Sequence, residues 1–177
     1  MNATALRWLP NAITVARLGA VPVLAGVILS AEGPTTTLGA ALFTGVAATD
    51  FLDGMLARWL GAESHFGRVA DPLADRLVMA VGLVGLIVLG RFAWPVPTII
   101  LVRDAASVAA YVWYARRGRL LNVDLPGKVS SALAMVATAL ALLSTAGWID
   151  ALFWAAVALS VATLANYART TLTSTPA

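Results

Sequence analysis

Residues 50–75 read DFLDGMLARWLGAESHFGRVADPLAD, and this stretch joins two strongly apolar segments of the chain. It contains four aspartates, Asp50, Asp53, Asp71 and Asp75. The first two are three residues apart and the last two are four apart, so on helices each pair shares one face. Carboxylates at membrane depth are costly and are usually functional. Two facing pairs would form a cluster of oxygen ligands that suits hard divalent cations.

The composition is that of an integral membrane protein. The chain has 177 residues, of which 60% are hydrophobic and 12% are charged, whereas about a quarter of the residues in a soluble domain are charged. We expect a single membrane-embedded domain over residues 1–170 and a disordered polar tail over 171–177. The absence of cysteine and the single His65 argue against thiolate or histidine-ligated metal sites.

Six apolar runs predict six transmembrane helices and therefore an all-α integral membrane fold. Each run is close to the ~20 residues that a helix needs to cross the hydrocarbon core, and a helix satisfies its own backbone groups in lipid. A short interfacial helix is a further expectation for residues 1–10, with a frayed terminus as the alternative. The runs are 12–30, 36–57, 72–90, 95–115, 129–146 and 149–168.

Basic residues mark one side of the predicted bundle. Most of them lie at alternate ends of the runs, whereas the opposite ends carry Arg91 with Glu32 and Asp150. The positive-inside rule then predicts that both termini face the cytoplasm. We expect a multi-pass protein of the prokaryotic cell membrane that contacts anionic lipid and no nucleic acid, with the aspartate cluster open to the cytoplasm. The basic residues at the ends predicted to face the cytoplasm are Arg7, Arg58, Arg68, Arg76, Arg116, Arg117, Arg119, Lys128 and Arg169.

Two simpler readings accompany these patterns. Each aspartate could pair with an arginine instead of a metal ion, and the candidates are Arg17, Arg58, Arg68 and Arg76. The regular spacing of four aspartates favours the metal site. Frequent small residues indicate close helix packing rather than a ligand site. They include Gly39, Gly45, Gly82 and Gly85.

The residues around the aspartates match a known pattern. The order Asp50-x2-Asp53-Gly54-x2-Ala57-Arg58-x8-Gly67-x3-Asp71-x3-Asp75 resembles the signature of the CDP-alcohol phosphotransferase family at all of its fixed positions. Near the N-terminus, Pro10-Asn11-x2-Thr14-x2-Arg17 resembles the first-helix motif of the same family.

This resemblance implies an enzyme that moves a substituted phosphate from a CDP-linked donor to an alcohol and releases CMP. It implies two divalent ions, Mg²⁺ or Mn²⁺, held by the four aspartates, with Asp75 also acting as the general base. It implies a homodimer as well. The residues that would line the CDP site are Gly54, Ala57, Arg58 and Gly67, with Asn11 and Thr14 as further candidates. For Asn11 a helix cap after Pro10 is the alternative.

The acceptor alcohol depends on two basic residues. An arginine inside an apolar run faces a polar cavity or a carboxylate, so Arg103 is either a clamp for an acceptor phosphate or the partner of Asp104. Lys128, after Gly127, resembles the Gly-Lys pair of the phosphatidylglycerophosphate synthase and cardiolipin synthase branches. Its alternative is a positive-inside anchor.

Two departures from the phosphatidylglycerophosphate synthase branch affect the choice of acceptor. Tyr111 stands where that branch has a second arginine, and residues 127–131 read GKVSS instead of Gly-Lys-x-Lys-Thr. The expected substrates are CDP-diacylglycerol and a glycerol-type alcohol, and the departures slightly favour phosphatidylglycerol over glycerol 3-phosphate. A divalent-cation transporter that uses the four aspartates as its ion site is the alternative function. A non-catalytic scaffold would leave the aspartate spacing unexplained.

Overall fold

The computed structural model consists of six α-helices and, over the residues it describes, contains no β-strand. It describes the backbone of residues 3–60, 67–116 and 125–173, and the side chains of residues 16–49, 74–110, 112 and 127–166. The all-α class is confirmed, and one helix falls on each predicted apolar run. The helices are α1 (Ala3–Leu29), α2 (Thr37–Leu60), α3 (Gly67–Val88), α4 (Pro95–Arg116), α5 (Leu125–Leu143) and α6 (Gly147–Thr173).

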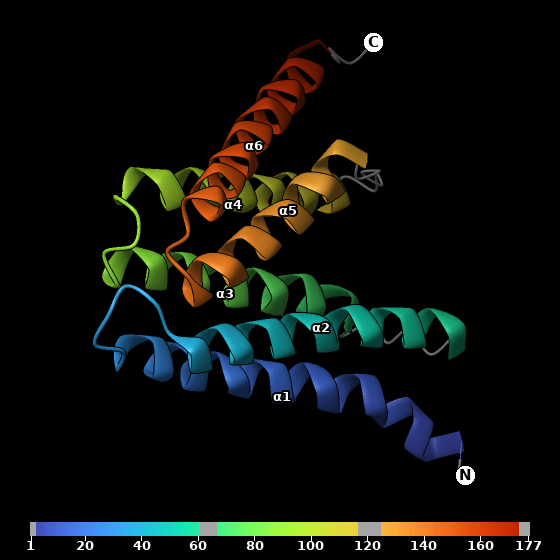
Figure 1. The fold of residues 1–177 in the computed structure, drawn as a ribbon. Helices are drawn as coiled ribbons and strands as arrows, with labels where there is room; N and C mark the ends of the chain where they lie inside the picture. The colour runs from blue at the N-terminus through green and yellow to red at the C-terminus, as the bar shows by residue number, and fades with distance from the viewer. Residues whose placement is uncertain (1–2, 61–66, 117–124, 174–177) are drawn as a thin grey trace.

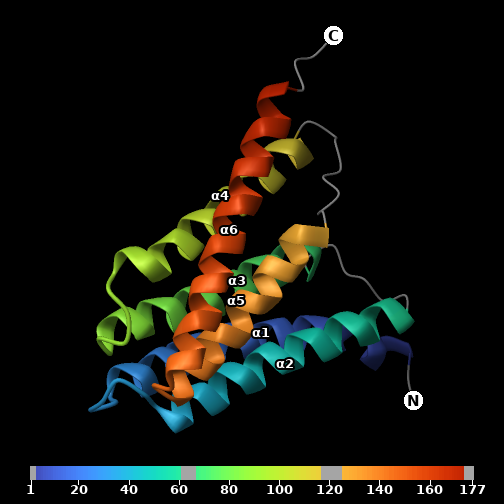
Figure 2. The ribbon, with the colours of Figure 1, turned by 45° about the horizontal axis from the view of Figure 1, so that its top comes forward.

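The helices pack so that the functional stretch lies at one end of the bundle. Helix α1 contacts α2 and α3, α3 contacts α4 and α5, and α6 contacts α4 and α5. Figure 1 shows the end of α2, the start of α3, the end of α4 and the start of α5 on the same side of the molecule. We call this side the aspartate end. Helix α6 crosses its neighbours steeply, and its C-terminal part stands clear of them (Figures 1 and 2).

Close helix approach in the core depends on glycine. A Cβ atom added at Gly82 would lie 2.6 Å from the ring of Phe43, and one added at Gly85 would lie 2.6 Å from the side chain of Ile28. The packing prediction is therefore confirmed at these two glycines. At Gly45 a Cβ would meet no atom within 4 Å among the described residues. The largest fully buried apolar side chains are Leu24, Ile28, Phe43, Leu83, Leu86, Ile100, Leu142, Ile149 and Phe153.

Local hydrogen bonds fix two of the helix boundaries. Thr36 caps α2, because its Oγ1 accepts a hydrogen bond of 3.1 Å from the backbone N–H of Gly39. Helix α3 ends at Val88, and Gly90 follows it with a φ of 67°, which suits a residue without a side chain. The backbone N–H groups of Gly90 and Arg91 donate to the carbonyls of Ile87 and Leu86 at 3.0 and 2.9 Å, which is the Schellman arrangement.

At the end of the bundle opposite the aspartate end, an ion pair joins the connection after α3 to the first turn of α6. Arg91, after α3, pairs with Asp150 in the first turn of α6, and its Nη2 also donates to the carbonyl of Ser144 at 3.5 Å. The Arg91 guanidinium lies 4.8 Å from the centroid of the Phe92 ring, and Phe92 stacks on Phe153 at 4.3 Å. The few charges predicted for this end are thus partly neutralised by each other.

Two boundaries differ from the sequence predictions. Residues 3–10 form the first turns of α1 and not a separate interfacial helix. Helix α6 continues to Thr173, three residues into the predicted tail, and residues 174–177 of that tail lie outside the described residues.

One segment of the described chain, Gly147–Asn166 in α6, is long and apolar enough to cross a membrane. Three shorter apolar helical segments accompany it: Ala16–Leu29, Thr37–Thr49 and Gly127–Leu143. The number of membrane spans and the side of the termini stay predictions.

Candidate active site

The four aspartates lie on two helices that pack against each other. The backbone of Asp50 and Asp53 belongs to the C-terminal half of α2, and that of Asp71 and Asp75 belongs to the N-terminal half of α3. Since α2 and α3 contact each other, the two pairs come to the same end of the bundle (Figure 1). Asp75 is partly buried, whereas the side chains of the other three lie outside the described ones.

A metal site at this position stays a prediction. The described side chains include no group of three His, Cys, Asp or Glu residues that could hold a metal ion. Of the predicted ligands, only Asp75 is among those side chains. The backbone shows that the carboxylate-bearing segments of two contacting helices lie at the same end of the bundle.

The predicted CDP-site residues come from the three helices around the aspartates. Helix α1 contacts both α2 and α3, and its N-terminal part lies on the side of the aspartate end (Figure 1). Arg17, the last residue of that motif, is 4% exposed and therefore sits inside the bundle. The remaining residues have a described backbone, in α1, α2 and the first turn of α3, but their side chains lie outside the described set. They are Asn11, Thr14, Gly54, Ala57, Arg58 and Gly67.

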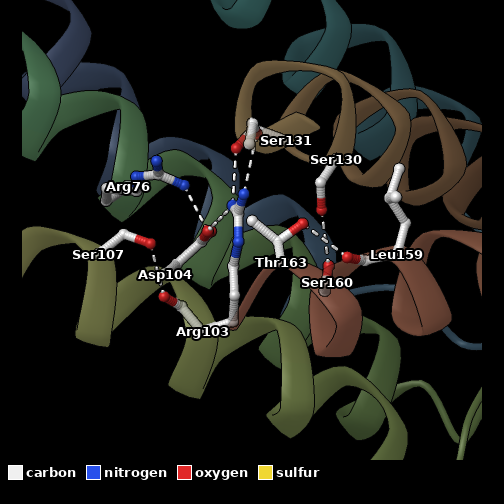
Figure 3. A network of polar contacts seen from close by, with 10 residues as sticks. Arg76, Arg103, Asp104, Ser107, Ser130, Ser131, Leu159, Ser160 and Thr163 are labelled. Carbon is white, nitrogen blue, oxygen red and sulfur yellow. Dashed lines mark hydrogen bonds and ion pairs between the residues drawn. The ribbon is translucent and has the colours of Figure 1, made fainter. Parts of the chain in front are cut away.

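A group of charges, with Arg103 and Asp104 buried and Arg76 partly buried, links α3 to α4 next to this stretch (Figure 3). Asp104 Oδ1 pairs with Arg76 Nη1 at 2.5 Å and with Arg103 Nη1 at 2.7 Å. Arg103 is 2% exposed and Asp104 is 7% exposed. We call these three residues the arginine–aspartate network. Its formal charge is +1, because two guanidinium groups share one carboxylate.

Arg103 also holds the beginning of α5. Its Nη1 donates to Ser131 Oγ at 2.7 Å and its Nη2 donates to the carbonyl of Gly127 at 2.8 Å. Its Nε is buried and has no hydrogen-bond partner among the described residues. The ion pair with Asp104 that the structural alternative required is present. The role of Arg103 as a phosphate clamp stays a prediction, as does the acceptor role of Lys128, which is exposed beside Gly127.

Hydroxyl groups continue this polar interior towards α6. Ser130 and Ser160 share a buried hydrogen bond of 3.1 Å between α5 and α6 (Figure 3). Thr163 Oγ1 donates to the carbonyl of Leu159 at 2.7 Å, and Ser107 Oγ donates to the carbonyl of Arg103 at 2.9 Å. The start of α5 is therefore fixed from two sides, by Arg103 of α4 and by Ser160 of α6.

Two members of this assembly were not assigned to it from the sequence. Arg76 is predicted only as a partner for the aspartate cluster, but it pairs with Asp104 of α4. Ser131 is predicted only as a departure from the Gly-Lys-x-Lys-Thr pattern, but its hydroxyl accepts a hydrogen bond from Arg103. The sequence signal that could have indicated these contacts is that charged residues inside apolar runs need polar partners.

Comparisons with known proteins agree with the motif. The sequence model described as CDP-alcohol phosphatidyltransferase matches residues 7–162. CDP-diacylglycerol–glycerol-3-phosphate 3-phosphatidyltransferase 1, chloroplastic/mitochondrial, of Arabidopsis thaliana is 35% identical over 91% of this chain and 62% of its own length. The probable phosphatidylglycerophosphate synthase of Mycobacterium tuberculosis H37Rv is 32% identical over 78% of this chain and 68% of its own. The CDP-diacylglycerol–glycerol-3-phosphate 3-phosphatidyltransferase of Bacillus subtilis is 30% identical over 76% of each. The chain thus spans 62% to 76% of the length of these relatives.

Proposed function

Because the chain belongs to the CDP-alcohol phosphatidyltransferase family, we propose that it transfers a phosphatidyl group from CDP-diacylglycerol to glycerol 3-phosphate and releases CMP. The observation that carries this proposal is the family match over residues 7–162, which includes the whole signature from Asp50 to Asp75. Relatives from a plant and from bacteria are named for this transfer. None of the comparisons supports the cation-transporter alternative.

In this proposal Asp50, Asp53, Asp71 and Asp75 hold two divalent ions, Mg²⁺ or Mn²⁺. Carboxylate oxygens suit such hard cations, and α2 and α3 bring the four residues to one end of the bundle. Arg76, the nearest arginine to Asp75 in sequence, pairs with Asp104 of α4. When bound, the ions would neutralise charge on the donor pyrophosphate and on the departing CMP.

Asp75 is the proposed general base. A hydroxyl oxygen of the acceptor attacks the phosphatidyl phosphorus, and the bond from that phosphorus to the bridging oxygen of CMP breaks. The electron pair of this bond leaves with CMP, while Asp75 takes the hydroxyl proton. A carboxylate is a weak base, so it needs the hydroxyl within hydrogen-bond reach and in line with the leaving group. Asp75 is partly buried and directly follows the fully buried Ala74 on α3.

Glycerol 3-phosphate is the proposed acceptor. Its phosphate is doubly charged, and the start of α5 offers Lys128 beside the positively charged arginine–aspartate network. The buried Nε of Arg103, which has no partner among the described residues, is a further donor near this position. The sequence slightly favoured phosphatidylglycerol because Tyr111 and the 127–131 run lack two cationic groups. The names of the relatives now favour glycerol 3-phosphate, and we adopt it.

We further propose a multi-pass cell-membrane protein with six spans, both termini in the cytoplasm, a cytoplasm-facing active site and a homodimeric assembly. The described part of the structure has polar residues inside, among them Arg103, Asp104 and Ser130, and large apolar side chains outside. That distribution suits a lipid surrounding. The exposed apolar side chains include Val23, Leu29, Val84, Val88, Trp94, Val136, Trp148, Trp154 and Val161.

The test of the reaction is a panel of acceptors. The purified protein is offered CDP-diacylglycerol, Mg²⁺ or Mn²⁺, and one of glycerol 3-phosphate, phosphatidylglycerol, inositol phosphate or serine, and both CMP release and product mass are read. We expect CMP together with phosphatidylglycerophosphate in the glycerol 3-phosphate arm. A cardiolipin product in the phosphatidylglycerol arm would reassign the acceptor. Metal flux into proteoliposomes without CMP release in any arm would instead support the transporter.

The orientation is tested with single cysteines, because the native chain has none. Cysteine at Glu32 should react with a membrane-impermeant maleimide from outside intact cells. Cysteine at Lys128 should react only after the cells are permeabilised. The opposite pattern would invert the proposed topology.

A further inference from the structure

We propose that Asp104 is a positioning residue, which holds Arg76 and Arg103 together and thereby fixes the acceptor end of α5 against the helix that carries Asp75. This inference rests on the proposed transfer reaction. It assigns to Asp104 no contact with either substrate. Its role is to act through two arginines on residues that make those contacts.

One carboxylate oxygen of Asp104 is shared by Arg76 and Arg103. Oδ1 of Asp104 lies 2.5 Å from Arg76 Nη1 and 2.7 Å from Arg103 Nη1. Both guanidinium groups therefore meet at a single buried atom, since Asp104 is 7% exposed. Without that negative charge the two cations would repel each other at close range in a poorly solvated interior. Asp104 thus keeps α3 and α4 in register at this level.

Hydrogen bonds connect Arg103 to the proposed acceptor site at the start of α5. Arg103 donates to the carbonyl of Gly127 at 2.8 Å and to the hydroxyl of Ser131 at 2.7 Å. These two residues are one helical turn apart, and Lys128 lies between them. The guanidinium group of Arg103 therefore pairs with Asp104 and also hydrogen-bonds to the turn of α5 that contains Lys128.

Arg76 connects Asp104 to the part of α3 that carries the proposed general base, Asp75. Arg76 directly follows Asp75 in the sequence, so an anchor on Arg76 also restrains the backbone of the proposed base. One carboxylate consequently connects the residue that takes the proton with the residues that hold the acceptor. Displacing such groups by about 1 Å can cost about a hundredfold in rate, so the link has a kinetic consequence.

The chain supplies a matched control for a variant of Asp104. Asp150 also forms an ion pair with an arginine, Arg91, at the end of the bundle opposite the aspartate end. Asp104→Asn and Asp150→Asn each remove one carboxylate charge and keep the size of the side chain. Any effect on folding from the loss of an Arg–Asp pair should appear in both variants.

The kinetic test compares the KM values for the two substrates. For Asp104→Asn we expect the KM for the acceptor to rise at least tenfold while the KM for CDP-diacylglycerol stays within twofold. For Asp150→Asn we expect both constants within twofold of wild type. Asp104→Glu, which restores the charge, should recover part of the acceptor affinity. Wild-type constants in Asp104→Asn, or equal changes in both asparagine variants, would overturn the proposal.

A distance measurement tests the same link without an activity assay. The chain has no native cysteine, so spin labels at Leu77→Cys on α3 and Val129→Cys on α5 are unique, and both sites are exposed, at 39% and 49%. We expect the pulsed-EPR distance distribution to broaden when Asp104→Asn is added and to stay unchanged when Asp150→Asn is added. An unchanged distribution with Asp104→Asn would refute the positioning role.

Two further arms keep the result interpretable. If Asp104→Asn does not fold, Ser131→Ala removes only one contact of Arg103 and should raise the acceptor KM about threefold in the same direction, with no change as the contrary result. The proposed function has its own failure, namely wild-type protein that transfers no phosphatidyl group. In that case the EPR comparison still decides whether Asp104 couples α3 to α5.

Discussion

Gly82 of α3 and Phe43 of α2 touch so closely that a Cβ atom on the glycine would lie 2.6 Å from the phenylalanine ring and 2.9 Å from Thr138 Cγ2 of α5. Helices α2, α3 and α5 therefore pack closely against each other at Gly82, which has only a hydrogen atom in place of a side chain. Phe43 and Thr138 are fully buried, so a methyl group added at Gly82 would be inserted into the core. This contact sets how near α2 and α3 come, and those helices carry the four aspartates.

Replacing Gly82 by alanine should therefore destabilise the fold. We expect the free energy of unfolding to fall by about 1–3 kcal/mol, which is the usual cost of an overpacked core. The matched control is Gly45→Ala, because a Cβ there meets no atom within 4 Å among the described residues. That control should be neutral or slightly stabilising, since alanine favours helix by about 1 kcal/mol over glycine. Thermal unfolding in detergent measures both, and equal midpoints would contradict the packing account.

Removal of divalent metal should stop the transfer. We expect EDTA to abolish CMP release and excess Mg²⁺ or Mn²⁺ to restore it, because the aspartate cluster would otherwise leave the donor pyrophosphate unneutralised. Asp53→Asn should show little activity at any metal concentration. Glu32→Gln removes an exposed acidic residue in the connection between α1 and α2 and should behave like wild type. Full activity in EDTA would exclude the metal role of the aspartates.

Asp75→Asn should lose turnover rather than donor binding. A positioned general base contributes about 10²–10⁴-fold to a rate, so we expect kcat to fall in that range. Binding of CDP-diacylglycerol, measured by calorimetry in the presence of metal, should change far less than kcat. A variant with wild-type kcat would show that another group takes the acceptor proton.

The hydrogen bond between Ser130 and Ser160 should behave as a coupled pair. Either single alanine variant leaves a buried hydroxyl without its partner, at a cost of about 1–3 kcal/mol. The double variant removes both hydroxyls and should be less destabilised than the sum of the single variants. Thermal unfolding of the four proteins completes the cycle. Strictly additive effects would mean that the two hydroxyls do not interact.

Much of the helical framework could be predicted from the sequence, because each apolar run has the length of one helix and turn residues separate the runs. The Gly82 and Gly85 contacts followed from the same small-residue pattern. Pro10 suggested a break, but α1 runs from Ala3 through it to Leu29. Inside a helix a proline removes one backbone hydrogen bond and crowds the carbonyl four residues earlier, but here the helix continues past Pro10 despite that cost.

The polar network shows where sequence reasoning stops. The adjacency of Arg103 and Asp104 in the chain suggested their ion pair, which the structure contains. The pair between Arg76 and Asp104 depends on how α3 packs against α4, and no spacing within one helix encodes that contact. For the same reason Ser131 looked like a missing phosphate ligand before its hydroxyl was found beside Arg103. The side chains of the aspartate cluster itself stay at the level of the sequence prediction.

Arg91 is synthesised 59 residues ahead of its partner Asp150. Under the proposed topology this arginine lies at the end of the bundle that is translocated across the membrane, and the counter-charge of its ion-pair partner is made 59 residues later. Both α4 and α5 must be made before the first turn of α6 delivers that charge. Helix α6, the last to be made, therefore supplies the carboxylate that neutralises Arg91. A nascent chain halted before α6 would keep a positive charge on the translocated side, which opposes its own orientation.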